Sequence, residues 1–85
     1  MSERRRSEVT SAITNAIARH HVETWKRGEG KDLVQRSLGL EASSFWQLAE
    51  DRPFLVSKIL LITEVLRQTY DTPTALRLAY RRHCP

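Results

Sequence analysis

The apolar residues of this chain recur every three or four positions, which is the spacing of one face of an α-helix. Glycine and proline interrupt that spacing at Gly28, Gly30, Gly39, Pro53 and Pro73. The pattern therefore predicts an all-α fold, a compact bundle of about five helices with a helix-turn-helix-like arrangement around Gly39. The expected helices cover 7–27, 31–38, 42–50, 53–69 and a last segment that starts near residue 72.

Two of these helices carry more apolar surface than a single buried face needs. The first helix, over 7–27, has two apolar strips, so we expect it to be covered from two directions, by the rest of the domain and by a partner subunit. The helix over 53–69 is apolar on nearly all sides, which is typical of a core helix or an oligomer interface. Both features predict a homodimer. The larger strip of the first helix consists of Val9, Ala12, Ile13, Ala16, Ile17 and His20, and the smaller strip of Ala18, Val22 and Trp25.

The length of 85 residues allows one domain, 1–85, and predicts modest stability for a monomer. We expect residues 1–6 to form a basic flexible arm and residues 84–85 to fray. Cys84 is the only cysteine, so an internal disulfide is impossible, and reinforcement by a second copy is one alternative. The last helix is expected to begin with Thr72 as its N-cap and Pro73 at its first position.

The sequence offers no catalytic or metal-binding pattern. It has no glycine-rich phosphate loop, no nucleophile–base motif and no paired Cys or His ligands at metal spacing. His20 and His21 are adjacent, so on a helix they point about 100° apart and cannot easily share one metal. We therefore expect no enzyme activity, no cofactor, no metal and no small-molecule substrate.

No segment has the character of a signal peptide or a membrane span. The charged N-terminus has no apolar run behind it, and the most apolar stretch, 54–66, is too short to span a bilayer. That stretch also contains Lys58 and Glu64. We expect a cytoplasmic protein that does not contact a membrane.

The charge balance favours a polyanionic partner. Fourteen Lys and Arg residues oppose ten Asp and Glu residues, for a formal net charge of +4. Basic residues gather at both ends of the chain, where they flank the apolar middle. Those expected to contact phosphates are Arg4, Arg5 and Arg6 at the N-terminus, while Arg77, Arg81 and Arg82 lie at the other end.

The segment 32–66 has the order short helix, Gly39 turn, short helix, long helix. Leu38 and Leu40 stand on either side of the glycine, and Phe45 and Leu48 supply the inward side of the second helix. In this order and spacing the segment resembles the helix-turn-helix of the phage repressors, the family of Cro and lambda repressor.

The resemblance implies that the second short helix enters the major groove of duplex DNA. Ser43, Ser44, Trp46 and Gln47 would face the bases, with Gln47 able to pair with an adenine edge. Arg36 and Arg52 would contact phosphates. The leading hypothesis is therefore a small DNA-binding transcriptional regulator.

Two alternatives stay open. The expected reading helix holds no Lys or Arg, and Glu41, Glu50 and Asp51 surround it with negative charge. An exposed tryptophan more often marks a protein contact than a base contact. The first alternative is thus a helical protein–protein interaction module, an adaptor or inhibitor, and the second is a small RNA-binding protein that uses the terminal arginines. The predicted partner contacts of the interaction module are Trp25, Val22 and Trp46.

Overall fold

The computed structural model describes residues 3–83 and shows an all-helical fold, with no strand in that range. The helical residues form three stretches, 3–51, 53–66 and 72–83, and the first of these bends at Gly28 and at Gly39. The prediction of about five separate helices is corrected accordingly. Along the chain the elements are α1 (Glu3–Trp25), η1 (Lys26–Gly30), α2 (Lys31–Leu38), η2 (Gly39–Glu41), α3 (Ala42–Asp51), α4 (Pro53–Leu66) and α5 (Thr72–His83).

Two glycines make the bends inside the first stretch. Gly28 has φ −87° and ψ −127°, outside the helical region, and turns the chain from α1 into α2. Gly39 has φ 57°, a value that side chains other than glycine rarely adopt, and it turns the chain from α2 towards α3. The corner predicted at Gly39 is therefore present, although a 3₁₀ turn rather than a loop follows it.

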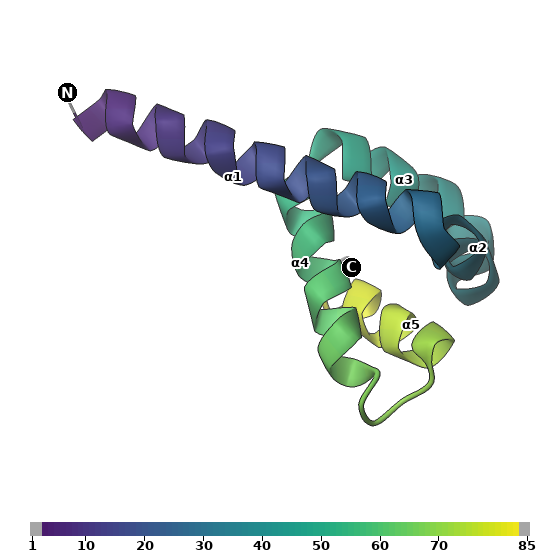
Figure 1. Cartoon of the computed structure of the whole chain (residues 1–85). Helices are drawn as coiled ribbons and strands as arrows, with labels where there is room; N and C mark the ends of the chain where they lie inside the picture. Colours follow the sequence, from purple (N-terminus) through teal and green to yellow (C-terminus); the bar gives the residue numbers. More distant parts are fainter. Residues whose placement is uncertain (1–2, 84–85) are drawn as a thin grey trace.

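Helix α4 is the spine of the fold, because α1, α3 and α5 all pack against it (Figure 1). Pro53 stands at its start, where the missing N–H costs no hydrogen bond. The largest fully buried side chains come from four helices: Val34, Phe45, Val56, Ile59, Leu60, Thr63 and Leu76. The prediction that α4 forms the core is therefore confirmed for the side that carries Val56, Ile59 and Leu60.

The buried strip of α1 is the smaller one. Ala18 and Val22 are buried and Trp25 is half-buried, because α4 and the α2–α3 part of the chain lie on that side. Every member of the larger strip is exposed. The rest of the described chain therefore covers the smaller strip and leaves the larger strip uncovered.

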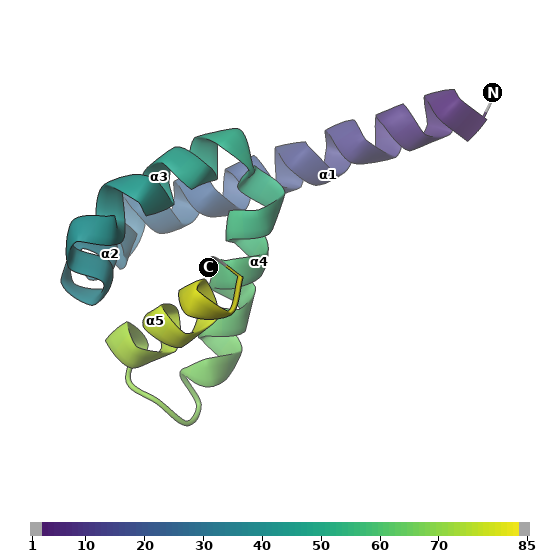
Figure 2. The same cartoon turned by 180° about the vertical axis from the view of Figure 1, so that it is seen from behind.

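The first half of α1 extends away from the other helices, as both views show (Figures 1 and 2). The helix begins at Glu3, four residues before the predicted start, so residues 3–6 are helical. Residues 6–13 are all exposed. This projection makes the molecule elongated, with principal extents of 46 × 26 × 25 Å.

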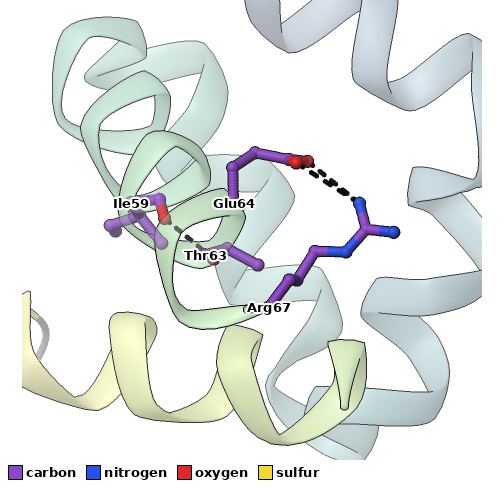
Figure 3. Close-up of polar contacts among 4 residues, drawn as sticks. All are labelled: Ile59, Thr63, Glu64 and Arg67. Atoms are coloured by element: carbon purple, nitrogen blue, oxygen red, sulfur yellow. Dashed lines mark hydrogen bonds and ion pairs between the residues drawn. The ribbon is translucent and has the colours of Figure 1, made fainter. Parts of the chain in front are cut away.

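Polar contacts lie along the last turns of α4 (Figure 3). The buried hydroxyl of Thr63 donates to the carbonyl of Ile59 at 2.8 Å, so it is satisfied within its own helix. On the surface, Arg67 forms an ion pair with Glu64, with 3.2 Å between Nη1 and Oε1.

Asp71, rather than the predicted Thr72, caps α5. Its carboxylate accepts a hydrogen bond from the backbone N–H of Thr74 at 3.1 Å. That bond places the cap one residue earlier than the sequence suggested.

Candidate functional site

The projecting helix α1 carries a row of large apolar side chains on its open side. Val9 is 44% exposed, Ile13 56% and Ile17 65%. Residues four apart lie one above the other on a helix, so these three form one continuous stripe. Ala12, Ala16 and His20 extend it and are also exposed.

Helix α4 carries a second apolar stripe. Phe54 is 56% exposed, Leu61 57% and Val65 66%. Their spacing of seven and four residues keeps them on one face, with the exposed Lys58 between the first two. This face is turned away from Val56 and Leu60, which are buried in the core.

Helix α1 crosses α4 at a point that lies one helical turn from a member of each stripe. Nδ1 of His21 and Oγ of Ser57 share a hydrogen bond of 2.7 Å at this crossing. Ile17 lies one turn before His21, and Leu61 lies one turn after Ser57. Phe54, one turn before Ser57, helps to line a shallow hollow of about 320 Å³ with Thr10, Thr14 and neighbouring α1 residues.

We call this combined surface the α1–α4 apolar face. It contains six large apolar side chains, each between 44% and 66% exposed. Large exposed apolar side chains that line up at helical spacing, rather than lying scattered singly, mark a place where another molecule binds. It consists of Val9, Ile13 and Ile17 of α1 and Phe54, Leu61 and Val65 of α4.

The predicted reading residues lie on the surface of α3. Ser43, Ser44 and Gln47 are all exposed. The amide of Gln47, however, donates to the carboxylate of Asp51, at 3.4 Å to Oδ2. The exposed side of this helix also carries Glu50, and Glu41 precedes it, so a phosphate backbone would meet negative charge there.

The turn before α3 departs from the expected helix-turn-helix packing. Leu38 is half-buried, but Leu40 is 101% exposed instead of turning inward beside it. The glycine at the corner has the required positive φ, yet the residue after it contributes nothing to the core.

The two tryptophans are less accessible than the partner-contact prediction assumed. Trp46 is half-buried, with its ring edge-on to Phe45 at 5.0 Å between centroids. The ammonium of Lys26 lies 5.4 Å from the centroid of the same ring. Trp25 is half-buried against the core. Val22 is only 5% exposed, so the protein's own core, and not a partner, covers it.

The predicted phosphate contacts are scattered over the molecule. Arg36 forms an ion pair with Asp32, 3.0 Å from Nε to Oδ2, and Arg52 is exposed between α3 and α4. Arg6 is exposed on the projecting half of α1, far from α2 (Figures 1 and 2). The side chains of Arg4 and Arg5 lie outside the described part of the chain, as do Cys84 and Pro85.

One further hollow lies beside α3. Its volume is about 570 Å³, and Lys26, Lys31, Gln35, Ser43 and Trp46 are among the residues that line it. Within residues 3–83, no three His, Cys, Asp or Glu side chains come close enough together to hold a metal ion. No described helix combines the length and apolar character needed to cross a membrane.

Comparison of the chain with family models, with curated proteins and with solved structures yields no match. The resemblance of residues 32–66 to the phage repressors therefore stays a prediction.

Proposed function

We propose that this chain is a helical interaction protein that binds a protein partner through the α1–α4 apolar face. One observation carries the proposal: six large apolar side chains, arranged as one stripe on each of two crossing helices, are about half exposed. Proteins of this size cannot bury all of their apolar residues, but scattered exposure differs from two stripes at helical spacing.

The free energy available at this face suits a binding site. Full burial of a Val, Leu, Ile or Phe side chain is worth about 1.5–3 kcal/mol. Each of the six is already partly covered, so burying the remainder gives about 1 kcal/mol per side chain, or roughly 6 kcal/mol in total. Binding also costs lost translational and rotational freedom, so polar contacts around the face must supply part of the affinity.

A capture experiment with matched variants tests the proposal. The wild-type chain, Leu61→Glu and Leu40→Glu are each immobilised and exposed to a lysate of the source cells. Leu40 is fully exposed but lies outside the apolar face, so it is the control for adding a charge to a surface leucine. We expect wild type and the Leu40 variant to retain the same proteins, and the Leu61 variant to lose them at least tenfold.

Circular dichroism establishes that all three proteins are equally helical before the comparison. Equal capture by wild type and both variants, together with unchanged self-association of the Leu61 variant, would contradict the proposal. Since both variants add one glutamate in place of an exposed leucine, a difference in capture reports the position of the added charge and not its presence.

DNA binding through α3 is a second candidate. It is favoured by the exposure of Ser43, Ser44 and Gln47 directly after the Gly39 corner, and by the net charge of +4. Binding to mixed duplex DNA should then fall steeply as salt rises, because phosphate contacts release counterions. Ser44→Ala combined with Gln47→Ala should reduce sequence preference with the fold intact. Absence of binding at low salt would eliminate this candidate.

A further inference from the structure

We infer that a second copy of this chain occupies the α1–α4 apolar face, with the two α1 helices packed antiparallel about Ile13. This inference rests on the proposed function, since it names the occupant of the same face. It predicts a symmetric dimer in which each copy covers the projecting half of the other copy's α1.

The projecting half of α1 needs a neighbour in order to persist as a helix. Residues 6–13 are exposed on all sides of two helical turns, and the first buried side chain of α1 is Ala18. Isolated helices shorter than about 12–15 residues are marginal in water. Thr10 and Thr14 donate their hydroxyls to the carbonyls of Arg6 and Thr10, at 2.9 Å and 2.8 Å, so these groups bond within the helix itself.

The stripe on α1 is complementary to itself when reversed. In an antiparallel pair centred on Ile13, Val9 of one copy lies opposite Ile17 of the other, and the two Ile13 side chains meet at the centre. Residues 3–23 of both helices then overlap, a seam of about 30 Å at 1.5 Å per residue. The exposed Ala12 and Ala16 beside the seam allow the two backbones to approach closely.

Charge is also complementary in this arrangement. Arg6 of one copy lies opposite His20 of the other and one helical turn from Glu23, and all three side chains are exposed. A parallel pair would instead place each Arg6 beside its own counterpart. Opposite charges at the ends of the seam therefore favour the antiparallel orientation.

The area that a stable dimer needs brings α4 into the interface. A specific interface buries about 800 Å² on each partner, which is roughly one eighth of the 6206 Å² exposed by this chain. A seam about 30 Å long between helices about 10 Å across is too narrow by itself. Phe54 lies beside Thr10 and Thr14 on a flank of α1 next to the seam, so a partner helix that extends over this flank also covers Phe54.

The first test is the mass in solution, measured by light scattering over a range of concentrations. We expect wild type to have twice the 9.9 kDa mass of the chain. Ile13→Glu places two carboxylates face to face in an apolar seam, so it should raise the dissociation constant about a hundredfold or more. The control is Leu78→Glu on α5, an exposed leucine outside the face, which should stay dimeric. A monomeric wild type at all concentrations would overturn the inference.

The second test reads the register with single cysteines in a Cys84→Ser background, because Cys84 is the only native cysteine. A disulfide needs Cα atoms within about 7 Å. Ile13→Cys should therefore cross-link to itself, and a mixture of Val9→Cys and Ile17→Cys should give the mixed dimer. Val9→Cys alone should not cross-link, because its counterpart lies eight residues, or about 12 Å, along the seam.

Self-cross-linking of Val9→Cys without the mixed product would overturn the antiparallel arrangement. The outcome is separable from that of the proposed function. If wild type is monomeric but the Leu61 variant loses a captured protein that the Leu40 variant retains, the face binds a different chain and only the second copy is excluded.

Discussion

Gly30 offers the most direct test of how α1 is joined to α2. The residue is buried, and a Cβ added to it would overlap the indole and carbonyl oxygen of Trp25 and lie 2.9 Å from the carbonyl carbon. The backbone carbonyl of Trp25 belongs to the wide turn of η1 and cannot rotate away as a flexible side chain can. Gly30→Ala must therefore open the turn or shift α2 relative to α1.

The expected loss follows from two opposing contributions. Overpacking of a close contact costs about 1–3 kcal/mol. Alanine in a helical position regains about 1 kcal/mol relative to glycine, and the backbone of Gly30, with φ −61° and ψ −40°, is helical. Because the added Cβ would overlap backbone as well as side-chain atoms, the overpacking cost lies in the upper part of its range, about 2–3 kcal/mol. The net effect should be a loss of about 1–2 kcal/mol in the free energy of unfolding, which lowers the melting temperature by about 4–8 °C per kcal/mol in a domain of this size.

Gly28→Ala is the matched control, because an added Cβ there has no atom within 4 Å. Urea unfolding followed by circular dichroism compares the two variants with wild type. We expect Gly28→Ala to lie close to wild type and Gly30→Ala clearly below both. Equal stability of the two variants would refute the close packing of Gly30 against Trp25.

Three further predictions concern single contacts. His21→Ala and Ser57→Ala should each lower the free energy of unfolding in urea by about 1 kcal/mol. Because the two side chains share one hydrogen bond, the double variant should lose less than the sum of the two single losses. Full additivity would contradict the hydrogen bond. Leu40→Ser should change stability by less than about 0.5 kcal/mol, because Leu40 is fully exposed; a larger loss would place it inside. Hydrogen bonds from the side chain and backbone of Thr74 lower the pKa of Asp71 below 3.8. Its stabilisation should therefore be complete above that value and be lost as the pH falls through the folded-state pKa, and Asp71→Asn should lack this acid dependence in thermal melts.

The helical periodicity of the sequence was sufficient to predict most of the secondary structure. The corner at Gly39 follows from the conformational freedom of glycine, and the start of α4 follows from Pro53. The form of the two connections, a wide turn over 26–30 and a 3₁₀ turn over 39–41, could not be inferred, since glycine is compatible with a loop as well as with either turn. The cap of α5 was displaced by one residue because Asp71 and Thr72 are both good capping residues and only their backbone positions distinguish them.

The sequence did not indicate which apolar strip of α1 the domain itself buries. It predicted two strips covered from two directions, and the core covers the strip of Ala18 and Val22 while Val9, Ile13 and Ile17 stay exposed. Small side chains let α4 cross close to α1, and the His21–Ser57 hydrogen bond holds that crossing. Periodicity identifies an apolar face but contains no information on what covers it, so the second strip was predicted and its open state was not.

The exposed side of α3 and the α1–α4 apolar face differ in what their side chains lose or gain when water is removed from them. On α3, Ser43, Ser44 and Gln47 can keep their hydrogen bonds to water, so nothing in the isolated chain requires a ligand there. On α1 and α4, each exposed isoleucine and leucine keeps apolar surface in water, and the projecting half of α1 has no buried side chain among residues 6–13. A partner on the apolar face would remove apolar surface from water and would also pack against the projecting half of α1. A partner on α3 would do neither. A partner on the apolar face should therefore protect the backbone amides of residues 6–13 from hydrogen exchange, while one confined to α3 should leave them unprotected.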